Sequence, residues 1–451
     1  MAVKNRFNNI GSKEWLPFQK SWFVPSNTED LYRSNVRFFT QSNEEFPLPK
    51  VFYKGDELGT FNKVCKEEGR QSCTKMNEHL MYAILDLRGK YRNLETYKED
   101  KEGVVAMALD IYKHLAHRKF LCVFIENLES DTFQPLAWDL AKTLSSHYSL
   151  KDEKIACFKE GASLEGGKCF YALYFRKDEK SAESLQSRHR SFLDNGHGST
   201  VLREKLGAWQ VVKPPRRKPN EILHPAKYPE QLIEQFVKTF TRESERVFDP
   251  MSGTGSTQVA ALNTGRRAYG CELSPFFSEI AKERCAEAAE SEDDFTIVNE
   301  DAKRCGDLGF PIIDYVITSP PYWDMLNMKG AEYQARRKEK GLQLNYSDDE
   351  NDLGNVEDYD AFVRTLVDVY MAMDSILKPG AHITIIVKNI KKKGSNYPFA
   401  WDLSEQLCER GWKLLPEFFW CQDDINLAPY GYGNTWVSNT FHQYCITFQK
   451  P

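Results

Sequence analysis

The sequence VFDPMSGTGSTQVAALNTG, residues 247 to 265, joins an apolar run to an amphipathic one through a glycine-rich turn. VFD predicts a short strand, and STQVAALNTG predicts a helix that ends at Gly265. Between them, Gly253 and Gly255 let the backbone approach a ligand where Cβ atoms would collide, and the N–H groups of the helix point at that ligand. A third glycine, which a pyrophosphate-binding fingerprint would need, is replaced by Gln258. The stretch predicts a strand–turn–helix ligand site, with a turn required only for packing as the alternative.

On both sides of this stretch, apolar runs of strand length alternate with amphipathic runs of helix length. Alternation at this spacing is typical of a parallel, doubly wound sheet. We therefore expect an α/β fold with a Rossmann-like sheet of seven strands. The predicted strands are 246–250, 267–273, 295–301, 314–323, 381–390, 412–421 and 441–450.

The N-terminal half contains a partial copy of this pattern. The stretch 116–144 reads like 381–407, with PLAWDL matching PFAWDL at the start of a predicted helix, and each copy ends in a further strand. The sequence therefore predicts a degenerate α/β region of the same fold before the main sheet. We expect an N-terminal extension over 1–78, the repeat over 79–212, a linker rich in proline and arginine over 213–223, and a catalytic domain over 224–451.

Composition narrows the class of protein. The 451 residues are 41% hydrophobic and 28% charged, which is typical of a globular protein. Residues 1–223 carry a net charge of +6 and residues 224–451 one of −11, which is compatible with a polyanionic partner on one side. We find no membrane span or secretory signal, and expect a cytoplasmic location. The 11 cysteines lack metal-ligand spacing, so we expect reduced thiols and no metal site.

A second motif, DYVITSPPYWDM at 314–325, follows a predicted strand. Consecutive prolines have no N–H to donate, so backbone carbonyls face outward at the carboxyl end of the strand, where open α/β sheets bind ligands. Ser319 adds an acceptor hydroxyl, and Tyr322 and Trp323 add aromatic faces. Acceptors beside a π surface suit a ring with an exocyclic amino group, although the motif also occurs as a plain turn.

Together, in this order, the motifs resemble the amino-methylating DNA methyltransferases, in the order of motifs called gamma. FDPMSGTGST looks like the cofactor loop of that family and TSPPYW like its catalytic loop, while ILHPAKYPEQL, ELSP and NEDA match the accompanying cofactor segments. The resemblance covers residues 224–451. It implies transfer of a methyl group from S-adenosylmethionine to N4 of cytosine or N6 of adenine in double-stranded DNA, with the base flipped out of the helix.

The resemblance also implies roles for individual residues. Ser319, Pro320, Pro321 and Tyr322 would form the catalytic loop that holds the target base. The cofactor would be bound by His224, Lys227, Pro229, Asp249, Gly253, Gly255, Glu272 and Asp301. Trp323 and the cations of a polar insertion, Arg336, Arg337 and Lys338, are candidate contacts to nucleic acid, with a solvated charged loop as the alternative.

Several alternatives stay open at this point. Serine before the two prolines favours cytosine N4, with adenine N6 as the alternative. An RNA or protein methyltransferase of the same fold, or a non-catalytic DNA-binding partner, are the rival classes. Methylation at C5 of cytosine is excluded, because it requires a nucleophilic cysteine, usually after proline, and the sequence has no Pro-Cys. Residues 1–223 are candidates for DNA recognition; a companion restriction enzyme and a monomeric or dimeric state are further expectations.

Overall fold

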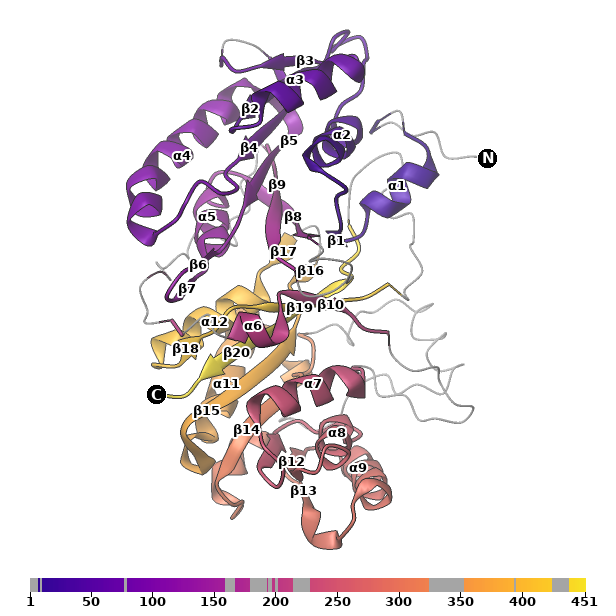
Figure 1. Ribbon diagram of the computed structural model, residues 1–451, viewed down its shortest axis with the longest axis vertical. Coiled ribbons are helices and arrows are strands. Elements are labelled where there is room, and N and C mark those ends of the chain that lie inside the picture. Colours follow the sequence, from indigo (N-terminus) through magenta and orange to yellow (C-terminus); the bar gives the residue numbers. More distant parts are fainter. Residues whose placement is uncertain are drawn as a thin grey trace. The chain divides into compact units, whose positions relative to one another are not determined.

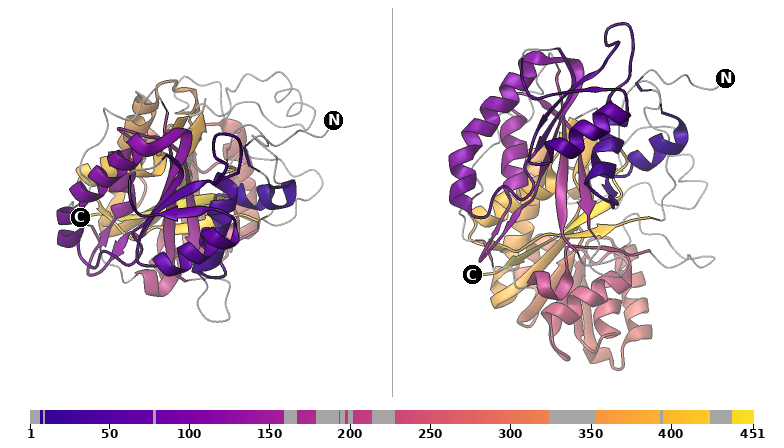
Figure 2. Two further views of the ribbon diagram at one scale, coloured as in Figure 1. Left: turned by 90° about the horizontal axis from the view of Figure 1, so that it is seen from above. Right: turned by 45° about the horizontal axis from the view of Figure 1, so that its top comes forward.

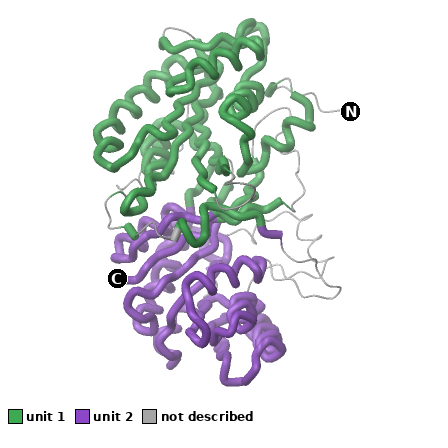
Figure 3. The backbone as a smooth tube through the Cα atoms, viewed as in Figure 1, with its two compact units in different colours: residues 1–211, 389–398, 419–443 green, residues 212–388, 399–418, 444–451 purple. Residues whose placement is uncertain are grey.

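The computed structural model describes residues 7–8, 10–76, 79–158, 167–178, 193, 197–198, 202–213, 228–323, 353–392, 395–423 and 438–451. The chain divides into two compact units (Figure 3). Unit 1 comprises residues 1–211, 389–398 and 419–443, and unit 2 comprises residues 212–388, 399–418 and 444–451.

Unit 1 is built on the first sheet. Its elements are α1 (Ser12–Phe18), β1 (Trp22–Phe23), α2 (Thr28–Phe39), β2 (Lys50–Lys54), α3 (Leu58–Glu67), β3 (Gln71–Cys73), β4 (Leu80–Asp86), α4 (Leu94–His114), β5 (Leu115–Ile125), β6 (Leu128–Glu129), β7 (Phe133–Gln134), α5 (Leu136–Leu144), β8 (Ser149–Cys157), β9 (Cys169–Arg176), α6 (Leu202–Leu206), β10 (Trp209–Val211), β16 (Ile390–Lys392) and β17 (Ser395–Tyr397). Of these, β10 pairs into the second sheet.

Within the described residues, the first sheet has seven strands in the order β1-β8-β9-β5-β4-β2-β3. The strands from β3 to β5 are parallel, whereas β9 is antiparallel to both of its neighbours. Helix α4 crosses over between β4 and β5 on one face, with α5 beside it, and α2 and α3 cover the other face (Figure 1). The central strand β4, LMYAILD, is apolar and buried along almost its whole length, as is usual for a strand covered on both faces.

All strands of the second sheet except β10 follow residue 228 in the chain. Its elements are α7 (Glu230–Phe240), β11 (Arg246–Asp249), α8 (Ser256–Leu262), β12 (Arg267–Glu272), α9 (Pro275–Ala288), η1 (Glu292–Asp294), β13 (Phe295–Asn299), η2 (Ala302–Asp307), β14 (Ile313–Thr318), η3 (Leu353–Asn355), α11 (Tyr359–Ala372), η4 (Asp374–Ile376), β15 (Leu377–Val387), α12 (Phe399–Glu409), β18 (Lys413–Leu414), β19 (Phe418–Cys421) and β20 (His442–Gln449).

In the described residues the strand order of this sheet is β10-β19-β20-β15-β14-β11-β12-β13, with β18 pairing β20. The strands from β13 to β15 are parallel and β20 is antiparallel to β15. Helices α7 to α9 cover one face and α11 and α12 the other, as the tilted view in Figure 2 shows. The predicted strands are all present, β10 joins them, and the run 412–421 is divided into β18 and β19 around Pro416.

The two sheets have the same strand order. Strands β2, β3, β4, β5, β9, β8 and β1 of the first correspond to β11, β12, β14, β15, β20, β19 and β10 of the second. The first sheet has no counterpart of β13 among the described residues. This correspondence confirms the predicted fold, a Rossmann-like sheet with a degenerate copy before it.

A shared irregularity fixes the alignment of the copies. The pairing register shifts between β4 and β5 just before Tyr82, and between β14 and β15 just before Tyr315. Tyr82 therefore aligns with Tyr315, and counting along the strands aligns Asp86, at the end of β4, with Ser319.

The repeated Trp-Asp dipeptide has a structural reason in both copies. In unit 1, the Trp138 indole N–H donates to the Tyr171 hydroxyl at 2.8 Å, and Tyr97 donates to Asp139 at 2.6 Å. Unit 2 repeats this arrangement, with Trp401 donating to Tyr444 at 3.2 Å and Tyr359 donating to Asp402 at 2.7 Å. Buried polar groups need partners, so the tryptophan bonds fix helix α5 or α12 to its sheet, and the aspartate bonds fix it to the neighbouring helix α4 or α11.

The structure divides the chain differently from the predicted domain boundaries. Strands β2 and β3 belong to the first sheet, although they lie in the range expected to form an N-terminal extension. Residues 389–398 and 419–443 cluster with unit 1, although they lie in the range of the predicted catalytic domain. Among the described residues, no helix combines the length and the hydropathy needed to cross a bilayer.

Candidate functional site

The two sequence motifs meet at one edge of the second sheet. Strand β11 pairs in parallel with β14, with Val247 opposite Tyr315. The glycine turn follows β11 and the Ser-Pro-Pro-Tyr loop follows β14, so both leave the sheet at the carboxyl ends of adjacent strands (Figure 1). Open α/β sheets bind ligands at this edge.

Asp249, the last residue of β11, holds the glycine turn in place. Its buried carboxylate accepts hydrogen bonds from the Tyr228 hydroxyl at 3.0 Å, the Thr257 hydroxyl at 2.7 Å and the Met251 N–H at 3.0 Å. Burial raises the pKa of Asp249, and the hydrogen bonds oppose that shift. Sequence reasoning missed Tyr228 and Thr257; an aromatic hydroxyl just before the predicted Pro229 was the available signal.

The turn itself needs its glycines. Gly253 and Gly255 have φ of 54° and 79°, in the left-handed region that favours glycine. A Cβ on Gly255 would also lie 3.0 Å from the Ala281 Cβ of α9. The Gly253 N–H donates at 2.7 Å to Glu272, which ends the adjacent strand β12 and also accepts from the Ser274 N–H at 2.9 Å. Glu272 thus lies beside the turn.

Gln258 replaces the third glycine of a dinucleotide fingerprint and has a bracing role. Its buried amide donates to the Ser252 hydroxyl at 2.8 Å and to the Tyr269 carbonyl at 3.1 Å. It fills the space over Gly270, where an added Cβ would lie 2.3 Å from the Gln258 amide nitrogen.

Of the remaining predicted cofactor residues, two are described by the structure and two are not. Pro229 is the N-cap residue of α7, and Asp301 follows β13 and caps η2 by accepting from the Lys303 N–H at 2.9 Å. His224 and Lys227 lie outside the described residues.

The catalytic loop is fixed to the adjacent strand. The Ser319 hydroxyl donates to the Ile386 carbonyl of β15 at 3.1 Å, which leaves the lone pairs of its oxygen as acceptors. Pro320 is buried, while Pro321 and Tyr322 are partly exposed. Burial raises the pKa of Tyr322 to about 12, so its phenol is neutral at physiological pH. The Lys388 ammonium lies 4.5 Å from the centroid of the Tyr322 ring.

Trp323, predicted to contact nucleic acid, is instead buried at 4% exposure. Its indole N–H donates to the Glu357 carbonyl at 3.1 Å and its ring packs edge-on against Tyr359. Arg336, Arg337 and Lys338 lie outside the described residues.

The matching edge of the first sheet is filled by its own side chains. Tyr53 takes the place of Asp249, and its hydroxyl lies 2.8 Å from that of Tyr32. Tyr32 donates to Asp86 at 2.6 Å, and Asp86 also pairs with Arg88 at 2.6 Å. Burial raises the pKa of both tyrosines, which keeps them neutral donors. Unlike the glycine turn of unit 2, this edge has two rings and an ion pair at the strand ends.

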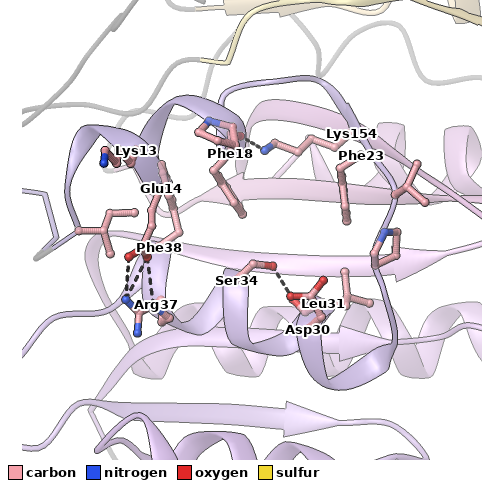
Figure 4. A pocket seen from close by; sticks show the side chains of 14 residues that line it. Lys13, Glu14, Phe18, Phe23, Asp30, Leu31, Ser34, Arg37, Phe38 and Lys154 are labelled. Carbon is pink, nitrogen blue, oxygen red and sulfur yellow. Dashed lines mark hydrogen bonds and ion pairs between the residues drawn. The ribbon is translucent and has the colours of Figure 1, made fainter. Parts of the chain in front are cut away.

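Unit 1 also contains a cavity of about 390 Å³ between α1, α2 and β8 (Figure 4). Its lining combines Phe18, Phe23 and Phe38 with the buried Lys154, whose ammonium lies 3.5 Å from the centroid of the Phe18 ring and donates to the Phe18 carbonyl. Burial lowers the pKa of Lys154 to about 7. None of the site residues predicted from the sequence lines this cavity.

Comparison with known proteins matches parts of the chain to DNA methylases and DNA methyltransferases. Residues 89–283 match the family model of the N6 and N4 DNA methylases, a range that includes the glycine turn but not the catalytic loop. The orphan methyltransferase M.BamHII of Bacillus amyloliquefaciens is 44% identical over 62 residues, which are 14% of this chain and 23% of that protein. The type II methyltransferase M.HpaI of Haemophilus parainfluenzae is 33% identical over 98 residues, 21% of this chain and 30% of that protein.

The chain thus covers less than a third of the length of these curated relatives. Among solved structures, TrmN from Thermus thermophilus is matched with a TM-score of 0.32 and 13% identity, over 66% of this chain and 59% of that one. Parts of the chain, the glycine turn among them, are thus similar in sequence to amino-methylating DNA methyltransferases.

Proposed function

We propose that the protein is an S-adenosylmethionine-dependent DNA methyltransferase that methylates the exocyclic N4 of cytosine, with adenine N6 as the alternative. The observation that carries this proposal is the position of two loops at adjacent strand ends. One is a left-handed glycine turn beside a carboxylate, and the other presents a serine, two prolines and a tyrosine. The match of residues 89–283 to the DNA methylase family model supports the same chemistry.

The residues at this edge fit the cofactor. Glycines at 253 and 255 give a ligand access to the backbone, and both oxygens of Glu272 are oriented by backbone N–H groups while keeping lone pairs for a ribose. Asp249 supports the glycine turn and does not itself offer an oxygen to the cofactor, because its carboxylate is buried and accepts three hydrogen bonds. When bound, S-adenosylmethionine supplies an electrophilic methyl group on a sulfonium.

The catalytic loop would act on the amino group of the base. Ser319 and the Pro320 carbonyl accept its hydrogens, which turns the nitrogen lone pair toward the incoming methyl group. Because the Ser319 hydrogen is committed to Ile386, the serine oxygen is an oriented acceptor before the base arrives. Tyr322 offers its ring as a stacking surface. The rate gain would come mainly from orientation, without a covalent enzyme intermediate.

The base is the finer part of the proposal. A serine hydroxyl supplies a neutral acceptor, which favours N4 of cytosine in the family that the chain resembles. Nucleoside mass analysis of DNA from a methylation-free host that expresses the protein would test it. 4-Methylcytosine would support the proposal and 6-methyladenine would select the alternative; methylated RNA without methylated DNA would overturn both.

We also propose that residues 1–223 position the DNA, with a purely stabilising role as the alternative. The net charge of +6 supports positioning. A fragment starting at residue 224 is a poor test, because residues 389–398 and 419–443 cluster with unit 1. Neutralising Arg216, Arg217 and Lys218 in the full chain tests DNA contact without disrupting unit 1. Each lost phosphate contact should reduce the slope of log affinity against log salt by about 0.9; an unchanged slope would exclude these three linker cations as contacts.

A further inference from the structure

Lys388 is a charged residue at the candidate site that the sequence motifs do not include. It follows directly after β15, whose residue Ile385 pairs with Thr318 at the end of β14. The lysine is partly buried, and its ammonium lies over the Tyr322 ring, 4.5 Å from the centroid. A cation within about 6 Å of a ring centroid is attracted by the π electrons.

The residues on both sides of Tyr322 are held in place by other contacts. Ser319 is bonded to Ile386 of the same strand, and Trp323 is buried with its N–H on the Glu357 carbonyl. These contacts fix the path of the backbone on both sides of the tyrosine. A cation resting on one face of the ring favours one orientation of that ring.

Unit 1 provides an internal comparison for this pair. The alignment that matches Asp86 with Ser319 also matches Gly89 with Tyr322. After the neighbouring strands β5 and β15, whose Phe120 and His382 pair with the aligned tyrosines, Glu126 matches Lys388. There, Glu126 accepts from the Gly89 N–H at 3.1 Å. Where the tyrosine is absent the cation is absent too, and an acceptor for the loop backbone replaces it.

We propose that Lys388 is a positioning residue that holds the Tyr322 ring in the orientation needed to stack on the flipped base. The inference rests on the proposed function, because it assigns Tyr322 to the base. Lys388 itself acts through the ring and takes no part in bond making. Burial lowers the pKa of Lys388, so keeping the ammonium charged there has a cost, which the ring contact offsets.

The test compares Lys388→Met, which keeps the length of the side chain but not its charge, with Lys388→Arg, which keeps the charge. Lys413→Met, at an exposed lysine of the same unit, is the matched control. The first measurement needs no DNA: the 19F spectrum of the full chain labelled with fluorotyrosine, in which Tyr322→Phe identifies the Tyr322 resonance. We expect this resonance to shift and sharpen in Lys388→Met and to stay near its wild-type position in Lys388→Arg and Lys413→Met. An unchanged resonance in Lys388→Met overturns the inference whatever the activity.

The second measurement is methyl transfer at saturating cofactor. We expect kcat to fall about 3- to 30-fold in Lys388→Met and to recover at least partly in Lys388→Arg, with cofactor affinity unchanged. Equal losses in both variants together with weaker cofactor binding would indicate a merely structural role and overturn the inference. If the wild-type protein methylates no DNA, the proposed function fails, and the 19F result still decides whether Lys388 orients the ring.

Discussion

At the end of β11 the chain turns through two left-handed glycines, whereas at the matching end of β2 it places Tyr53, whose hydroxyl meets that of Tyr32. The strand order, the register shift and the Trp-Asp contacts are common to both sheets. The comparison teaches that the framework and the site are separable: the framework is retained by buried contacts, while the site depends on a few residues at the strand ends.

The largest expected effect is on cofactor binding. Gly253→Val should weaken S-adenosylmethionine binding about 100-fold or more, because a branched side chain at a left-handed φ displaces the backbone donors of the turn. Calorimetry measures this, and should find one cofactor per wild-type chain. Gly69→Val in unit 1, at φ 67° with open space around it, is the matched control and should leave binding intact. Two cofactors bound per chain would contradict the expectation that only the second sheet binds the cofactor.

The filled edge of unit 1 should matter for stability alone. Asp86→Asn leaves Arg88 without its carboxylate partner in a largely buried position, and we expect a loss of about 2 to 3 kcal/mol in the free energy of unfolding. Asp100→Asn, which breaks a more exposed pair with Lys90, should cost less than about 1 kcal/mol. Denaturant unfolding measures both. A fall in kcat of the folded Asp86→Asn protein would mean that this edge takes part in the reaction.

The open edge of unit 2 should show the reverse pattern. Tyr322→Ala removes the stacking surface for the base, worth about 1 to 3 kcal/mol, so kcat should fall about 5- to 150-fold with cofactor affinity unchanged. Ser319→Ala should act on the same step. Single-turnover methylation with parallel calorimetry separates transfer from binding. Equal losses in both would place the catalytic loop in the cofactor pocket instead.

The smallest effect concerns the buried Lys154 in unit 1. Its folded pKa of about 7 lies below the value of about 10.4 in the unfolded chain. Between these values the unfolded state binds more protons, so stability rises with pH, and the cost of the buried charge is complete below pH 7. Lys154→Met removes that cost. The gain in unfolding free energy over wild type should therefore be larger at pH 6 than at pH 9, by at most about 3 kcal/mol, and should be seen as a larger gain in Tm.

The exposed Lys113→Met is the matched control for this prediction and should show no such pH dependence. If Lys154→Met changes Tm equally at both pH values, the ammonium is not destabilised by burial as the lowered pKa indicates.

The sequence allowed most of the second sheet to be predicted, because its strands and helices alternate with strong apolar patterns. Strands β2 and β3 were missed because KVFYK and QSC are short; β2 pairs with both β3 and β4, and these pairings are not evident from so few residues. The candidate site residues predicted from the sequence are those that form local motifs. Tyr228 and Lys388 were not among them, because their contacts with Asp249 and Tyr322 join positions that are distant in the chain.

Unit 1 includes residues 419–443, and two of its contacts reach across most of the chain. His442 lies 2.8 Å from the Ser21 hydroxyl, and Asn389 donates to Glu153 at 2.7 Å. A ribosome adding about 5 to 20 residues per second needs roughly 10 to 50 s to travel from residue 211 to residue 443. During that interval the first sheet waits for segments that have not been synthesised. The half of the protein that is made first therefore lacks two of its segments until nearly the end of synthesis, and throughout that interval a nascent chain would leave this unit incomplete and open to chaperones.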